Sequence, residues 1–182
     1  MASILASYLE LKFARAALLV TEPRETIAAK TREVIRAMLD RKIESLPVRT
    51  FLDLAKENIG LALLDCGLFR RIGSTVSVEA QTIHEYLVAQ DPDVDPFEWI
   101  YESGRPAEEY QPLRGAALFR LAEMNSNEAV LAIFERLAAQ RSLLPIFALP
   151  RLQNLSYFRD FFVRYIDNRH LSACLLYTSR CV

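Results

Sequence analysis

Two short strand-like runs separated by a glycine constrain the fold most, because the rest of the chain has helical periodicity. Val76, Val78 and Ala80 alternate with polar residues, which is the two-residue period of a half-buried strand. The run 68–72 precedes them, and Gly73-Ser74 lies between the two runs, where glycine supplies the positive φ of a two-residue turn. The sequence therefore predicts one small β-hairpin in a mainly α chain.

A short helix is predicted directly after the hairpin. Thr82 and Glu85 have the spacing of a capping box, in which the hydroxyl and the carboxylate bind free backbone N–H groups at a helix start. We therefore interpret both residues as caps, and we expect little loss of stability when His84 is replaced. The predicted apolar side of this helix consists of Ile83, Tyr86, Leu87 and Gln90.

The adjacent His84-Glu85 pair is also how the zinc motif HExxH begins. That motif needs a second histidine four residues later, and Val88 stands at that position. The other histidine of the chain, His170, lies far away in the sequence. We expect no metal site and no catalytic site here.

The segment LALLDCGLFRRIGSTVSVEAQTIHEYLVAQ resembles the winged-helix end of the NACHT-type signal-transduction NTPases, the STAND class. Gly67-Leu68-Phe69-Arg70 matches the first half of the family pattern, and Val78 stands where the family has an aromatic residue. The resemblance implies a winged-helix-like domain that contacts the NTPase core of a parent protein. The second half of the pattern is matched by Thr82, Ile83, Glu85, Tyr86, Leu87 and Ala89.

One position departs from this family. Its nucleotide-sensing histidine aligns with Ala80, whose methyl side chain offers no hydrogen-bond donor. His84 does not replace it, because His84 lies inside the predicted helix. The resemblance therefore implies no cofactor-binding residue in this chain.

The N-terminal residues predict a helix rather than a membrane span. Ile4, Tyr8, Leu11 and Leu18 follow one helical stripe, although Arg15 interrupts it. Charged residues break the segment before it reaches a membrane-spanning length. We expect a partly buried amphipathic helix and no signal peptide.

Two longer helices are predicted before the hairpin, at Glu25–Ser45 and at Phe51–Cys66, with Gly67 ending the second. The second helix has Asp53, Glu57 and Asp65 against the single cation Lys56. An acidic helix in front of the hairpin does not favour DNA phosphates. We interpret Arg70 and Arg71 as a solvated surface of the hairpin and expect no nucleic acid partner.

The region after Gln90 predicts a boundary and then more helices. DPDVDP has two prolines and three acids, so we place a linker and a short helix at residues 91–105, in which Trp99 is a packing anchor. Residues 106–172 predict three amphipathic helices with breaks at 125–127 and 145–150. The phrases AALFRLAE and AIFERLAA suggest a repeated helical unit that resembles a HEAT-like array, which implies a protein ligand.

Composition limits the class of protein. The chain has 182 residues, 52% of them hydrophobic, and a net charge of −1, so we expect a folded chain with one sizeable core or two small ones and no general attraction to nucleic acid or membrane. No G-x-x-x-x-G-K-[ST] and no G-x-S-x-G occur. We therefore expect no enzyme but a regulatory fragment, with residues 1–90 as its winged-helix-like part. The alternatives are a free-standing helical-repeat adaptor and a winged-helix DNA-binding regulator.

The C-terminal tail has an unusual sequence. Cys174–Ser179 reads CLLYTS, which the DNA string TGTCTCTTATACACATCT encodes, and that string resembles the transposon end of sequencing-library adapters. We expect residues 173–182 to be a non-native tail and the natural protein to continue differently. Only Cys66 then remains, as a core residue, so a reducing cytoplasm is the expected location.

Deleting residues 174–182 should change the free energy of unfolding by less than about 0.5 kcal/mol, because a tail that packs on nothing contributes nothing. Urea melts of the full and shortened chains measure this difference. A larger loss would mean that the tail belongs to the folded protein.

Overall fold

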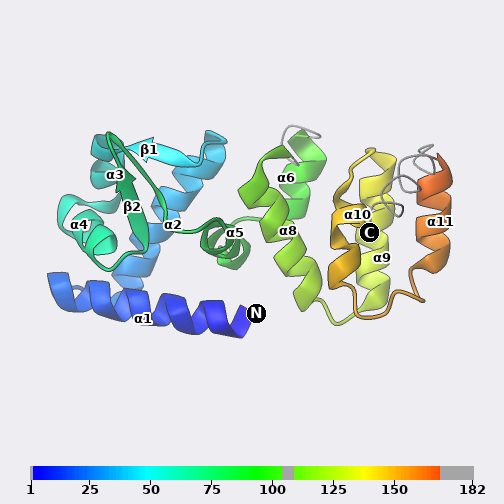
Figure 1. The fold of residues 1–182 in the computed structure, drawn as a ribbon, viewed down its shortest axis with the longest axis horizontal. Helices are drawn as coiled ribbons and strands as arrows, with labels where there is room; N and C mark the ends of the chain where they lie inside the picture. The colour runs from blue at the N-terminus through cyan, green and yellow to red at the C-terminus, as the bar shows by residue number, and fades with distance from the viewer. Residues whose placement is uncertain (1, 104–108, 169–182) are drawn as a thin grey trace, which may run out of the picture. The chain divides into compact units, whose positions relative to one another are not determined.

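The computed structural model describes residues 2–103 and 109–168, which form helices and one small antiparallel sheet (Figure 1). The chain divides into two compact units, residues 1–119 and 120–182, and the boundary falls inside helix α8 (Gln111–Glu123). The predicted class, mainly α with a small hairpin, is confirmed. His170 and the predicted tail at 173–182 lie outside the described residues.

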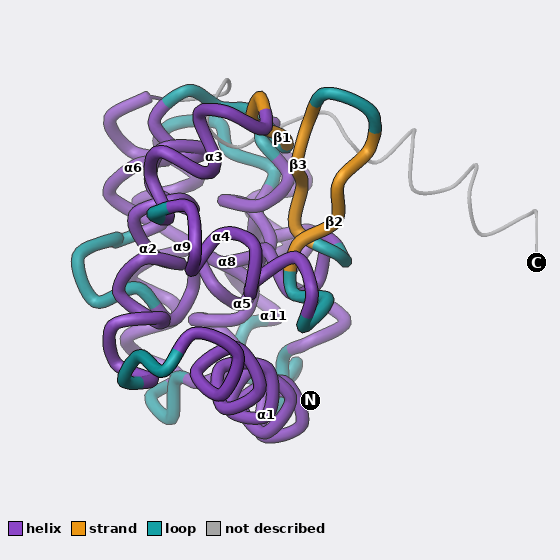
Figure 2. Tube along the Cα trace, turned by 90° about the vertical axis from the view of Figure 1, so that its left-hand side faces the viewer, coloured by secondary structure: helices purple, strands orange, loops and turns teal. Residues whose placement is uncertain are grey.

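The predicted hairpin is present as strands β2 (Phe69–Ile72) and β3 (Thr75–Val78), which run side by side in Figure 2. Ile72 lies opposite Thr75, so the turn has two residues. Gly73 has a φ of 60° and Ser74 has no positive φ, as in a type II′ turn. Val76 and Val78 are buried as predicted, but Ala80 is exposed, so the buried row ends with the strand.

A third strand, which the sequence did not predict, joins the sheet at the C-terminal end of the predicted helix Glu25–Ser45. Helix α2 (Arg24–Asp40) ends five residues before the expected Ser45, and β1 (Ser45–Pro47) pairs with β3 in the order β1-β3-β2. The free edge of β3 offers unpaired backbone groups, and pairing there places Leu46 in the core. Pro47 is tolerated because β1 is an edge strand.

The predicted helix Phe51–Cys66 consists of two helices, α3 (Val48–Ala55) and α4 (Glu57–Asp65). The chain turns at Lys56, which has a φ of 64°. This turn lets α4 pack closely against α3 at Gly60. If Gly60 carried a side chain, its Cβ atom would lie only 2.8 Å from Cδ2 of Leu52. Periodicity alone did not reveal the break, because both helices share one apolar pattern.

Gly67 ends α4 as predicted, with a φ of 72°. Its N–H donates to the carbonyl of Leu64 (3.0 Å), and the N–H of Leu68 donates to the carbonyl of Leu63 (3.1 Å). These two bonds form a Schellman motif, which satisfies the last carbonyls of the helix. The next residue after Leu68 starts β2, so the motif aims the chain directly into the hairpin.

Helix α1 (Ala2–Val20) is confirmed, but it buries the opposite side from the predicted one. Leu9 and Ala16 are buried, whereas Ile4, Leu11 and Leu18 are exposed. The helix packs against α2 and α4, and Nζ of Lys12 donates to the carbonyl of Cys66 at the end of α4 (2.5 Å). Cys66 itself is buried, as predicted, and its burial raises the pKa of its thiol.

The DPDVDP segment lies within the first unit, between α5 (Gln81–Gln90) and α6 (Pro96–Ser103). The short helix predicted after it is α6. Oδ1 of Asp95 accepts from the N–H groups of Phe97 (2.8 Å) and Glu98 (3.3 Å), which begins this helix. Trp99 is half-buried.

The second unit contains α9 (Asn127–Ala139), α10 (Leu144–Ala148), the 3₁₀ helix η1 (Leu149–Arg151) and α11 (Arg159–Asn168). The oxygen of Ser126 accepts from the N–H of Ala129 (3.2 Å) and caps α9 at the predicted break. The other predicted break, 145–150, is largely helical. Proline is tolerated there because it occupies the first turns of α10 and η1.

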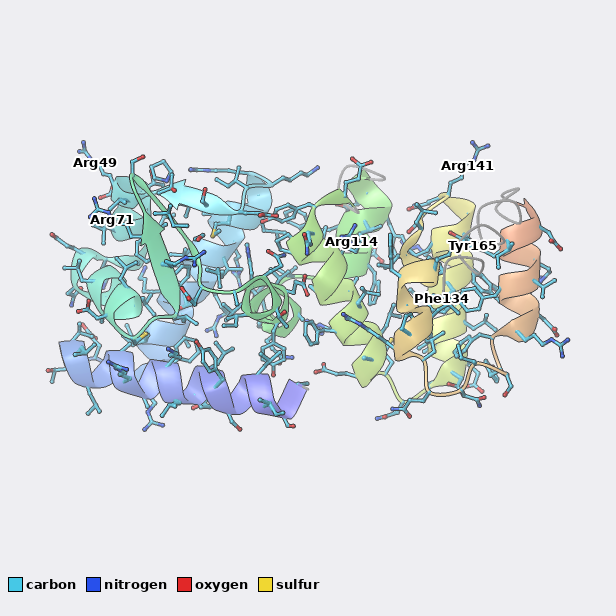
Figure 3. All side chains as sticks on the ribbon, viewed as in Figure 1. Arg49, Arg71, Arg114, Phe134, Arg141 and Tyr165 are labelled. Carbon is cyan, nitrogen blue, oxygen red and sulfur yellow. The ribbon has the colours of Figure 1, made fainter. Side chains whose placement is uncertain are left out.

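Aromatic rings form the core of the second unit. Phe134 of α9 stacks on Phe161 of α11 with ring centroids 5.5 Å apart, and Tyr165 stacks on Phe161 at the same distance. Figure 3 shows Phe134 and Tyr165 pointing into the space between their helices. The hydroxyl of Tyr165 also donates to the carbonyl of Ser142. Within the described part of the chain, no helix is both long and apolar enough to cross a membrane.

Candidate functional site

The residues that carry the family resemblance converge on the hairpin and α5, which we take as the candidate site. Val78 is buried at the end of β3, where it lies opposite Phe69 of β2. Ala80 is the exposed N-cap residue of α5, with extended backbone angles. The two halves of the matched pattern are thus brought together in space. The position of the family's histidine lies at the surface and carries only a methyl group.

The predicted capping box is wrong. Helix α5 starts at Gln81, and the carbonyl of Ala80 accepts from the N–H groups of Ile83 (3.0 Å) and His84 (3.1 Å). Thr82 therefore lies exposed in the first turn instead of capping it. The N–H of Glu79 still donates to the carbonyl of Leu68 beside the hairpin (3.0 Å), so the chain turns at Ala80, and the helix begins earlier than the T-x-x-E spacing indicated.

Helix α5 is buried over most of its surface rather than along one stripe. It packs against α1, α2 and β3, and the ring of Tyr86 meets the edge of Phe119 of α8 with centroids 5.6 Å apart. Gln90, expected on the apolar side, is exposed. The buried residues are Ile83, His84, Tyr86, Leu87, Val88 and Ala89.

Glu85 packs against the backbone of α8. If Gly115 carried a side chain, its Cβ atom would overlap the side chain of Glu85. Helices α5 and α8 are therefore in contact at this position because Gly115 has no side chain. Oε1 of Glu85 also accepts a long hydrogen bond from Nε2 of Gln81 (3.4 Å). Glu85 is therefore a residue of the α5–α8 contact rather than a cap, and Gly115 is the partner that the sequence analysis missed.

His84 is a core residue, contrary to the expectation that it could be replaced with little loss. Only 2% of its surface is exposed, and Nε2 has no hydrogen-bond partner among the described residues. Its ring lies edge-on to Tyr110, 6.4 Å away between centroids, and the Tyr110 hydroxyl donates to the carbonyl of Ile43 (2.8 Å). Burial lowers the pKa of His84 to about 4, so the imidazole is neutral at pH 7.

The described residues contain no group of three or more His, Cys, Asp or Glu side chains arranged to hold a metal ion. Val88, at the second histidine position of HExxH, is fully buried.

An ion pair that the sequence did not indicate fixes the end of α5. Nε of Arg36 donates to Oδ2 of Asp91 (2.6 Å), and its terminal nitrogen donates to Asp91 and to Asp93 (2.5 Å each). Asp91 has no exposed surface. Its burial favours a higher pKa, but the hydrogen bonds from Arg36 and from the Asp93 N–H outweigh this and lower the pKa. The pair joins the DPDVDP segment to α2.

A shallow cavity of about 350 Å³ lies between the outer face of the sheet and the start of α5. Ser45, Ser77 and Arg70 lie side by side in it across the three strands. Nε of Arg70 lies 3.8 Å from a carboxylate oxygen of Glu79, and both side chains are exposed. The cavity is polar and open, and its charges are mixed, so it has no preference for an anion.

No family model matches this chain, and comparison with the curated proteins and with the solved structures gives no match.

Gly115→Ala should destabilise the protein by about 1–3 kcal/mol, because the new methyl group overlaps Glu85 in a packed contact. In a helix without such an obstruction, replacing glycine by alanine normally stabilises the protein by roughly 0.5–1 kcal/mol. The sign of the change in the free energy of unfolding therefore shows whether the new methyl group meets Glu85. Thr82→Ala is the matched control and should change stability by less than about 0.5 kcal/mol. Urea unfolding measures all three chains, and a stabilised Gly115→Ala variant would show that α5 and α8 do not touch there.

Acid should weaken the fold through His84. The unfolded state takes up a proton near pH 6.5 and the folded state only near pH 4, so stability is complete above pH 6.5 and declines as the pH falls to 4. The loss reaches about 3 kcal/mol from this one group. His84→Phe keeps a ring but does not titrate, so its free energy of unfolding should vary much less over this interval. Equal pH dependence in both chains would contradict the assignment.

Proposed function

We propose that this chain is a non-catalytic regulatory part of a STAND-type NTPase of the cytoplasm. In this proposal the first unit is a winged-helix lid on the NTPase core, and the second begins a HEAT-like helical array that binds a protein ligand. The observation that carries the proposal is the convergence of the matched residues. Gly67 ends α4, Phe69 pairs with Val78, and Tyr86 and Leu87 lie in the core.

The order of elements supports a winged-helix-like first unit. Helix α2 is followed by β1, two helices and the β2–β3 hairpin, and β1 closes the sheet on the other side of β3. The small sheet and the helices share one core, which includes Phe51, Phe69 and Leu46. Phe51 and Phe69 are in direct contact, with ring centroids 5.0 Å apart.

The surface of α4 argues against the DNA-binding alternative. Glu57 and Asp65 are exposed on this helix, which is the one in front of the hairpin, and α1 packs along it. Arg71 at the hairpin and Arg49 at the start of α3 extend into solvent in Figure 3, but no row of cations accompanies α4. Phosphate contacts need cations on the helix that enters the groove.

A regulatory role is consistent with how α5 is held. Its neighbours leave it little freedom to move alone, so a displacement of the hairpin would be passed to α8 through the Glu85–Gly115 and Tyr86–Phe119 contacts. Helix α8 contains residues of both units. In the proposed switch, α8 carries the signal between the lid and the array.

The decisive test is the genomic sequence on the 5′ side of the Met1 codon. We expect the same reading frame to continue upstream through a G-x-x-x-x-G-K-[ST] motif, and the isolated chain to show no ATP binding in calorimetric titration. A stop codon with a separate promoter and no such motif nearby would contradict the proposal and favour the free-standing adaptor.

Two results would support other classes of protein. Micromolar ATP affinity of the isolated chain would give it a nucleotide site of its own. A salt-dependent shift of duplex DNA at protein concentrations well below about 100 μM would support the DNA-binding regulator.

A further inference from the structure

The outer side of α1 is an apolar surface without a partner in the described structure. Ile4, Leu11 and Leu18 are 72%, 68% and 86% exposed, and they recur at intervals of seven residues. In Figures 1 and 2, α1 runs along the edge of the first unit, and no other described element of that unit covers its outer side. Large aliphatic side chains in such a row are costly to leave in water.

The residues around this row fit helix-to-helix packing. With Ile4, Leu11 and Leu18 at heptad position a, Ser7 and Ala14 occupy position d. Both are small, so another helix can approach α1 closely. Position f contains Leu9 and Ala16, the residues that face the protein's own core, so the heptad surface points directly away from the body.

Two charged residues flank the row on opposite sides. Glu10 occupies position g and Arg15 the following position e. Both are exposed, and neither forms an ion pair with any residue in the described ranges. Charges at g and e set the partner and the direction of coiled-coil helices.

We propose that this surface, formed by Ile4, Ser7, Leu11, Ala14 and Leu18 with Glu10 and Arg15 at its borders, binds the same surface of a second copy of the chain in a parallel, in-register helix pair. In that arrangement Glu10 of each copy lies beside Arg15 of the other. The two-fold symmetry of the pair produces two such Glu10–Arg15 contacts, one on each side of the facing Leu11 side chains. This inference does not depend on the proposed function.

The charges select the parallel direction. In an antiparallel pair centred on Leu11, position g faces g and position e faces e, so Glu10 approaches Glu10 of the other copy and Arg15 approaches Tyr8. No opposite charges then meet. The parallel pair alone joins each carboxylate to a guanidinium.

The contact is small, with one helix of 19 residues in each copy. A stable interface usually buries about 800 Å² per partner, and this one falls short of that, so we expect a dissociation constant of about 1 μM or weaker. Association should therefore depend on concentration in the micromolar range.

Sedimentation equilibrium of the full chain over a series of concentrations tests the surface. Leu11→Lys should raise the dissociation constant at least about tenfold, because two ammonium groups would face each other at the centre. Leu61→Lys on α4 is the matched control, since Leu61 is also an exposed leucine (49%) and its replacement should leave association unchanged. At protein concentrations well below the parent's dissociation constant, both variants should keep the parent's melting curve, because neither residue is in the core. A parent chain that stays monomeric up to about 500 μM, or a dimer that Leu11→Lys leaves intact, would overturn the proposal.

Charge exchange tests the direction of the pair. Glu10→Arg alone should weaken association about fivefold at low salt by placing two arginines together, and adding Arg15→Glu should restore it. In a background in which Cys174 and Cys181 are serine, Ala14→Cys should oxidise to a covalent dimer, because residue 14 meets its own copy only in the parallel register. An antiparallel pair predicts no recovery in the double variant and no cross-link, and either result would contradict the assignment.

Discussion

Helix α5 is buried on nearly every side, and the rest of the first unit is arranged around that burial. The hairpin leads into it, α1 and α2 cover it, and α8 crosses it at Gly115. A helix of ten residues has little stability of its own, so it forms because its neighbours enclose it. Tyr86, Leu87 and Val88 are consequently core residues, although they point in different directions around the helix axis.

Such close enclosure restricts the polar residues of α5 and its ends. His84 is accommodated as a neutral ring, because a charged imidazole with no partner would be costly in the core. Asp91 keeps its charge although its own side chain has no exposed surface, because Arg36 neutralises it with two hydrogen bonds. The contrast between these residues follows from their partners. Nε2 of the histidine has no hydrogen-bond partner among the described residues, whereas the aspartate has a guanidinium in bidentate geometry.

Helix α1 shows why periodicity does not identify the buried side of a helix. Both of its sides are apolar, so the pattern of Ile4, Leu11 and Leu18 predicted burial as convincingly as the opposite side did. The structure buries Leu9 and Ala16 instead. In this orientation Lys12 reaches the carbonyl of Cys66, the C-cap residue of α4. The row left outside has the spacing and flanking charges of a surface for another helix.

The sequence by itself determined the local structures whose signals act over a few residues. Gly73 required a two-residue hairpin turn, Gly67 ended a helix, and the alternation at Val76 and Val78 set a strand. The tertiary structure decided what depends on distant partners. Residues 45–47 became a strand because β3 had a free edge, and Lys56 adopted a positive φ so that α3 and α4 could pack together. Thr82 lost its predicted capping role because the hairpin holds the chain as far as Glu79, and the helix then starts at Gln81. Glu85 met Gly115, 30 positions away, and Arg36 met Asp91 across 55. Pairings over such separations leave no local pattern, because their energy arises only once the chain has folded.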